Sequence, residues 1–103
     1  MLYVLVEMKV KESARSAFLD CCREVQPLVT AEDGCYGYEY TLATESPSAK
    51  DQILDPNVIT LVERWESAEK LAAHSASAHM KSFSEKVSGM RESVKITVHE
   101  TIF

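Results

Sequence analysis

Glu63, Trp65, His74 and His79 lie within seventeen residues of one another in the second half of the chain. In a strand, residues 63 and 65 share one face, where a carboxylate beside a large aromatic ring needs a hydrogen-bonding partner or a raised pKa. The imidazole group, with an ordinary pKa of about 6.5, exchanges protons near neutral pH. These residue types suit acid–base chemistry, with His74 or His79 as the base and Glu63 as the group that orients it.

The same residues also have purely structural explanations, which the sequence leaves open. Trp65 is of a kind that packs in a core, His74 can bond Glu63 or a backbone carbonyl, and His79 stands where a helix begins. A helical zinc site pairs two histidines four positions apart, whereas these two are five apart and the sequence indicates no third ligand. We therefore expect no metal.

Several common classes of protein are excluded by what the sequence lacks. The three glycines are scattered and form no phosphate-binding loop, and neither a Cys-x-x-Cys pair nor a Gly-x-Ser-x-Gly motif is present. A net charge of −5 argues against nucleic acid and anionic membranes as partners. The absence of a basic leader at the start and the odd number of cysteines, with Cys21 and Cys22 adjacent, predict reduced thiols in a cytoplasmic protein.

The elements that position the cluster form two strand–helix–strand halves. The first half opens with an expected strand over 2–10 and an amphipathic helix over 12–31, capped by Ser13. Pro27 lies inside this helix and predicts a kink or an early end. The segment 32–34 then stops the helix, with its glycine in a left-handed conformation.

The second strand is expected over 35–44. Tyr36, Tyr38 and Tyr40 alternate and should share one face, while Gly37 indicates a bulge or the close approach of a bulky group. A long polar loop follows over 45–57, and its Ile53-Leu54 pair has no reason to face water, which makes the loop a lid or a clasp on a partner subunit. The remaining elements are a strand over 58–66, a helix over 68–74 capped by Ser67, a helix over 78–88 capped by Ser77, and a strand over 93–102.

The order β-α-β-β-α-β predicts an α+β ferredoxin-like fold, with a four-stranded antiparallel sheet and the helices on one face. A length of 103 residues predicts a single domain, 1–103. The strands over 2–10 and 58–66 are apolar on both faces, so the face away from the helices must also be covered. We expect a homodimer whose sheets pack face to face and wrap into a shared α/β barrel.

The segment 62–67 (VERWES), His74 and the segment 77–83 (SAHMKSF) resemble the antibiotic biosynthesis monooxygenase (ABM) family, and so does 32–38 (EDGCYGY). The resemblance covers nearly the whole chain and implies a ferredoxin-like dimer. Members include oxygenases that use no metal, flavin or haem, so it implies oxidation of a quinol or polyphenol-like aromatic by O2 without a cofactor. The residues then expected to be catalytic are Glu63, His74 and His79, and those expected to line an apolar substrate pocket are Tyr38, Leu61, Trp65, Met80 and Phe83.

Other functions within the family fit less well. Its haem-degrading members use an Asn on the first strand and a haem-ligating His, whereas this chain has Glu7 there and no histidine around 83–85. An isomerase-like branch acts on a phosphorylated signalling compound and needs a basic pocket, for which only Arg64 and Lys81 lie near the cluster. A non-catalytic ligand-binding or stress-response barrel is the remaining alternative, since a fold does not fix a function.

Overall fold

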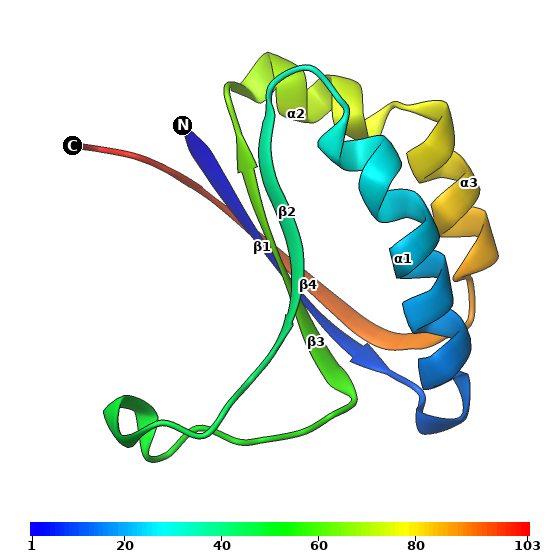
Figure 1. Cartoon of the computed structure of the whole chain (residues 1–103), viewed down its shortest axis with the longest axis vertical. Helices are drawn as coiled ribbons and strands as arrows, with labels where there is room; N and C mark the ends of the chain where they lie inside the picture. The colour runs from blue at the N-terminus through cyan, green and yellow to red at the C-terminus, as the bar shows by residue number, and fades with distance from the viewer.

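The computed structural model describes all residues, 1–103, as one four-stranded antiparallel sheet with helices on a single face (Figure 1). The strands lie in the order β2-β3-β1-β4, so the ferredoxin-like α+β arrangement is confirmed. None of the helices has the length and apolar character needed to cross a membrane. The elements are β1 (Leu2–Val10), a 3-10 turn (Glu12–Ala14), α1 (Arg15–Thr30), β2 (Cys35–Leu42), a second 3-10 turn (Pro47–Ala49), β3 (Val58–Trp65), α2 (Ala68–Ser75), α3 (Ala78–Lys86) and β4 (Arg91–Glu100).

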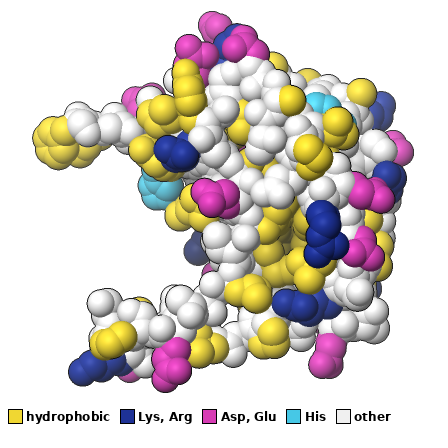
Figure 2. Space-filling model, viewed as in Figure 1, with side chains coloured by type: hydrophobic (Ala, Val, Ile, Leu, Met, Phe, Trp, Pro, Cys, Tyr) yellow, Lys and Arg dark blue, Asp and Glu magenta, His cyan; other side chains and the backbone are white.

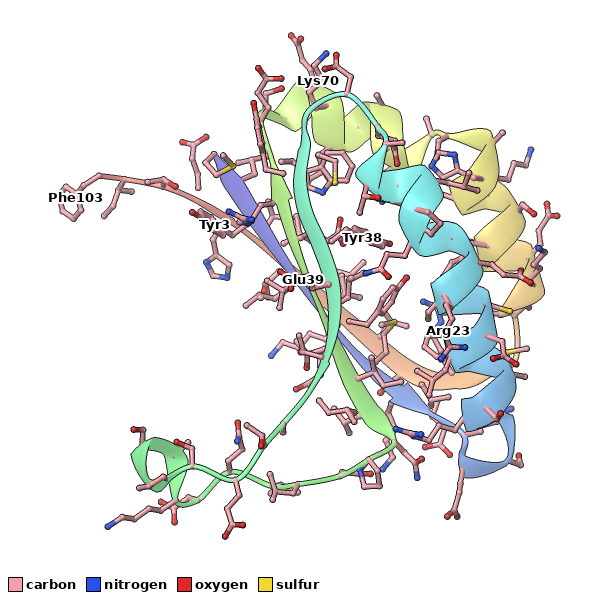
Figure 3. All side chains as sticks on the ribbon, in the orientation of Figure 1. Tyr3, Arg23, Tyr38, Glu39, Lys70 and Phe103 are labelled. Atoms are coloured by element: carbon pink, nitrogen blue, oxygen red, sulfur yellow. The ribbon has the colours of Figure 1, made fainter.

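The core lies between the sheet and the helices, and strand β1 supplies its centre. Alternate residues of β1 point to opposite faces, and those facing the helices are all buried. On the outer face, Tyr3 and Leu5 remain 40% and 39% exposed, and Figure 3 shows Tyr3 on the side of the sheet away from the helices. The buried residues from β1 and α1 are Leu2, Val4, Val6, Met8, Val10, Phe18, Cys22, Val25 and Val29.

Helix α1 departs from expectation at both of its irregular positions. It continues through Pro27 to Thr30, so the expected early end is wrong; Val25 and Val29 are buried on either side of the proline, and their packing holds the helix together. Ser13 is not the cap either. It lies within the 3-10 turn, and Ala14 precedes the helix with no side-chain hydrogen bond.

The end of α1 is fixed by a short loop that meets α2. Gly34 has φ +85°, as expected for a left-handed exit, and its carbonyl accepts a hydrogen bond from the Glu66 amide at 2.8 Å. Asp33 forms an ion pair with Lys70 of α2, and Figure 3 shows Lys70 beside this loop. The loop is therefore held against α2, which determines where Glu32 points.

Strand β2 contains the bulge that Gly37 indicated. Cys35 lies opposite Trp65 and Tyr38 opposite Glu63, so one extra residue is accommodated between them. The bulge turns Tyr36 outward, 54% exposed, while Tyr38 is 2% exposed, so the expected common face of the three tyrosines is wrong for Tyr36. The expected close approach is also present, because a Cβ on Gly37 would lie 2.9 Å from Nε of the Arg64 guanidinium.

Two apolar regions of the single chain remain exposed. On β4, Val94, Ile96 and Val98 lie on the helix side of the sheet, yet they are 42%, 61% and 52% exposed because the helices do not cover this edge strand. The loop between β2 and β3 projects from the body of the molecule, as Figure 2 shows. In the isolated chain its Ile53 and Leu54 are 84% and 51% exposed, and the expected role of the loop as a lid or a clasp on a partner subunit stays a prediction.

Candidate functional site

A cavity of about 490 Å³ lies between the sheet and the α2–α3 pair. Its walls are mainly apolar, and its polar groups include Glu63 and His74. Four of the five residues expected to bind substrate line it, namely Tyr38, Leu61, Met80 and Phe83. Further apolar lining comes from Val4, Val6, Met8, Leu71, Val94, Ile96 and Val98.

Trp65 is not a wall of this cavity. Its side chain is completely buried, and its indole Nε1 donates a hydrogen bond to Oε1 of Glu63 at 2.8 Å. The ring centroids of Trp65 and His74 lie 4.6 Å apart, with the planes inclined at 35°. Trp65 therefore supports the polar end of the cavity from behind, because it occupies the last position of β3, beneath α2.

Glu63 is a buried carboxyl group, 4% exposed, in the middle of the sheet. Burial raises its pKa; the hydrogen bond from Trp65 and the proximity of His74 act in the opposite direction, and the negative charge of Glu32 raises the pKa further. Oε1 of Glu63 is 3.9 Å from Nε2 of His74, beyond hydrogen-bonding distance. The expected hydrogen bond through which Glu63 orients the histidine is thus absent.

Glu32 takes that position instead. Its Oε2 lies 2.7 Å from Nδ1 of His74, and the two side chains are only 15% and 5% exposed. An ionised carboxylate only accepts hydrogen bonds, so this contact assigns the ring proton of neutral His74 to Nδ1. Nε2 is then left with a free lone pair beside the cavity, and that is the arrangement of a general base.

His79 contacts the same carboxylate from another direction. Its Nε2 is 2.9 Å from Oε2 of Glu32, but its side chain is 26% exposed and it does not line the cavity. Ser77 sets the spacing of the two histidines, since its hydroxyl donates to the His74 carbonyl at 2.7 Å and accepts from the Met80 amide at 3.3 Å. The expected caps of α2 and α3, Ser67 and Ser77, are both present.

Two tyrosines on β2 complete the surroundings of His74. Tyr38 packs edge-on against its ring, with centroids 5.5 Å apart, and Figure 3 shows Tyr38 on the helix side of the sheet. Burial raises the pKa of both Tyr38 and Tyr40, so each phenol stays protonated. The Tyr40 side chain lines the cavity, while its hydroxyl is buried and has no hydrogen-bond partner.

Glu32 is the functional candidate that sequence reasoning missed. It was placed in the segment that ends α1, and nothing in a local pattern pairs it with a histidine 42 residues later. The structure also shows a third potential metal ligand beside the two histidines, which their spacing in the sequence did not indicate. One ligand atom from each of Glu32, His74 and His79 lies within 4.8 Å of the other two.

Comparison with known proteins identifies the family to which this fold and site belong. The sequence profile of the family named Antibiotic biosynthesis monooxygenase matches residues 1–86, and the chain belongs to this family. It is 35% identical over 91 residues to the "Probable quinol monooxygenase YgiN" of Escherichia coli K12, covering 86% of each protein, and the Shigella flexneri protein of the same name gives the same values. This similarity supports a monooxygenase-type function.

Solved structures show the same fold at lower sequence identity. A protein from Nitrosomonas europaea that is named provisionally as an antibiotic biosynthesis monooxygenase superposes with a TM-score of 0.85 at 20% identity, with all of both chains covered. A conserved protein from Methanosarcina mazei Go1 gives a TM-score of 0.84 at 21% identity, covering 97% of this chain and 91% of the other. At these identities the likeness is one of fold.

Proposed function

We propose that this protein oxidises a quinol or polyphenol-like aromatic with O2, without a cofactor, in the cavity beneath α2 and α3. The observation that carries the proposal is the 2.7 Å contact between Glu32 and Nδ1 of His74, which directs Nε2 toward the cavity as a base. The similarity to a probable quinol monooxygenase supports the choice of substrate class.

The cavity suits an aromatic guest. Its volume lies within the range of about 300–1,000 Å³ that is typical of small-ligand sites. Apolar side chains surround most of the space, while His74 offers a polar contact for a hydroxyl group of a quinol. Arg91 is the only Lys or Arg that lines it; Arg64 and Lys81 do not, so the cavity is poorly suited to a phosphorylated substrate.

The reaction needs no external reductant because the quinol supplies all the electrons. His74 Nε2 accepts a phenolic proton, and the resulting anion passes one electron to O2. The semiquinone and superoxide then combine through a new carbon–oxygen bond to give a ring hydroperoxide. Cleavage of the oxygen–oxygen bond with loss of water leaves a hydroxyquinone, so one oxygen atom enters the product and the other leaves as water.

Each residue has a distinct part in this scheme. Glu32 holds the His74 ring and stabilises the imidazolium formed when Nε2 takes the proton, and that cation then stabilises the oxygen-derived anion. Trp65 fixes Glu63, which lies near the same nitrogen. His79 touches Glu32 but not the cavity, so we assign it a positioning role through that carboxylate.

The assembly we propose is a homodimer through the outer face of the sheet. Tyr3 and Leu5 are partly exposed there, and Val58 and Val62 are only partly covered in the isolated chain. These four side chains form an apolar patch among polar neighbours on the same face, such as Glu7, Thr60 and Thr97, and such a patch is commonly covered by another layer. A second copy of the chain provides that layer with two-fold symmetry.

Oxygen uptake with menadiol tests the proposed activity. The protein should accelerate uptake above the uncatalysed rate, and His74→Ala should lower kcat at least about 100-fold, as expected for loss of a general base. His99→Ala is a matched control, because His99 lies on β4 away from the cavity. Unchanged uptake in His74→Ala would exclude His74 as the base, and no acceleration with any quinol would favour a ligand-binding role.

A further inference from the structure

We propose that Glu32, His74 and His79 also bind a divalent transition-metal ion, for which Zn2+ is the probe, and that the bound ion prevents His74 from acting as a base. The binding claim stands on geometry alone. The inhibitory consequence rests on the proposed function.

The three side chains converge on one point from three separate elements. Glu32 follows α1, His74 lies in the last turn of α2, and His79 lies in the first turn of α3. Nδ1 of His74 and Nε2 of His79 approach the same oxygen, Oε2 of Glu32, at 2.7 and 2.9 Å. Two imidazole nitrogens and a carboxylate oxygen are a donor set that zinc and related ions favour over Mg2+ or Ca2+.

The distances are close to those of a coordinated ion. Zn–N and Zn–O bonds of about 2.1 Å at angles between 90° and 110° place the ligand atoms about 3.0–3.4 Å apart. The two contacts to Glu32 are only a few tenths of an ångström shorter than this range. Small side-chain rotations can therefore admit an ion, with the remaining coordination positions open to water.

Glu63 lies where a carboxylate that supports a zinc-bound histidine would stand. A metal-ligating imidazole commonly donates its other N–H to a carboxylate, which fixes the ring and increases its basicity as a ligand. Oε1 of Glu63 lies 3.9 Å from Nε2 of His74, on the opposite side of the ring from Glu32. A small movement of either side chain converts this contact into a hydrogen bond when Nε2 carries the proton.

Metal binding would rearrange protons without a net gain or loss. In neutral His74 the proton that faces Glu32 leaves Nδ1, where the ion binds, and Nε2 gains a proton beside Glu63. The same exchange in His79 moves its proton from Nε2 to Nδ1. Nε2 of His74 then has no lone pair for a phenolic proton, so an occupied site stops the first step of the proposed reaction.

The ion can reach its ligands without passing through the substrate cavity. The side chain of His79 is 26% exposed and does not line that cavity, whereas His74 does. Zinc should therefore lower kcat for quinol oxidation while leaving the KM for quinol nearly unchanged.

Equilibrium dialysis with elemental analysis, on protein that carries no histidine tag, tests the binding directly. We expect one Zn2+ per chain at micromolar free ion, and binding at least about 10-fold weaker in Glu32→Gln and in His79→Gln. His99→Gln controls for a surface histidine and should bind like the original protein. Circular dichroism of each metal-free variant establishes that it is folded.

Three results would overturn the proposal: no stoichiometric Zn2+ in the original protein, binding that survives His79→Gln, or binding that disappears in His99→Gln. A Co2+ complex gives an independent reading, since its visible absorption bands should appear in the original protein and be absent in His79→Gln. Dialysis requires no enzymatic activity, so a protein that binds zinc but oxidises no quinol refutes only the proposed function. Quinol oxidation without zinc binding refutes only the metal site.

Discussion

Glu32 and His74 are 42 residues apart in the sequence, yet Oε2 of one lies 2.7 Å from Nδ1 of the other. The contact depends on the loop after α1, which Gly34 and the Asp33–Lys70 ion pair hold against α2. Because the carboxylate and the imidazole are both largely buried, the hydrogen bond is shielded from water. The pair has the geometry of a base with its orienting carboxylate.

Glu32→Gln should reduce catalysis more than it reduces substrate binding. An amide oxygen can still accept the Nδ1 proton of His74, but it lacks the charge that stabilises the imidazolium formed on proton transfer. We expect kcat for menadiol to fall at least about 10-fold with little change in KM. A larger change in KM than in kcat, measured by initial oxygen uptake, would assign Glu32 to substrate binding instead.

Trp65→Phe should lower the stability of the protein. The substitution leaves a buried space and removes the donor that satisfies the carboxyl group of Glu63. Such changes together cost about 2–4 kcal/mol in the free energy of unfolding, measurable by urea denaturation. Combining it with Glu63→Leu should recover part of the loss, because the unsatisfied carboxyl group is then gone. If the losses of unfolding free energy in Trp65→Phe and Glu63→Leu simply add in the double variant, the hydrogen bond between Trp65 and Glu63 contributes nothing to stability.

Val62→Asp tests the proposed dimer. Val62 lies on the outer face of β3, opposite Leu5 of β1, so a carboxylate there would enter the apolar interface between two sheets. Removing one uncompensated charge from water costs several kcal/mol, and the dimer should dissociate. Light scattering at micromolar concentration measures the mass of both proteins. A monomeric original protein would contradict the proposed assembly.

Asp55→Asn should change the pH dependence of stability through the ion pair with Lys9. This contact lowers the pKa of Asp55 from 3.8 and raises that of Lys9 from 10.5, mainly through the side-chain hydrogen bond between them. The stabilisation is thus present at neutral pH, is lost as pH falls through the lowered pKa of Asp55, and is lost as pH rises through the raised pKa of Lys9.

The denaturation midpoints of the original protein and of Asp55→Asn should therefore differ by a constant amount across the neutral pH range. The difference should begin to shrink below the ordinary pKa of aspartate and vanish below the lowered pKa of Asp55, and it should vanish again in alkali above the raised pKa of Lys9. Asparagine can still accept the hydrogen bond from the Asn57 amide, so a difference that persists in acid would contradict a role for the charge of Asp55.

Local patterns in the sequence were sufficient for most of the fold. Alternation identifies the strands, and Ser67, Ser77 and Gly34 mark helix ends correctly because caps and left-handed glycines act within a few residues. The early end considered at Pro27 does not occur, because burial on either side of the proline outweighs the lost hydrogen bond. The place of Tyr36 was missed because a bulge changes the register by one residue.

The site was only partly predictable for a different reason. Glu63 and His74 could be brought together from their neighbouring elements, but Glu32 reaches them through a tertiary contact that no periodicity encodes. Trp65 shares a face with Glu63, as expected, yet its position at the end of β3 places it behind the cavity. Which residue on a common face meets a ligand depends on the exact packing of the helices above it.

The exposed apolar strip on β4, formed by Val94, Ile96 and Val98, leaves one side of the cavity in contact with bulk solvent. In the proposed reaction, a radical anion generated next to that side can diffuse away before it recombines with the ring. The superoxide released per quinol consumed would then measure how well the cavity is closed, and covering β4 should shift the outcome from superoxide release toward oxygen insertion.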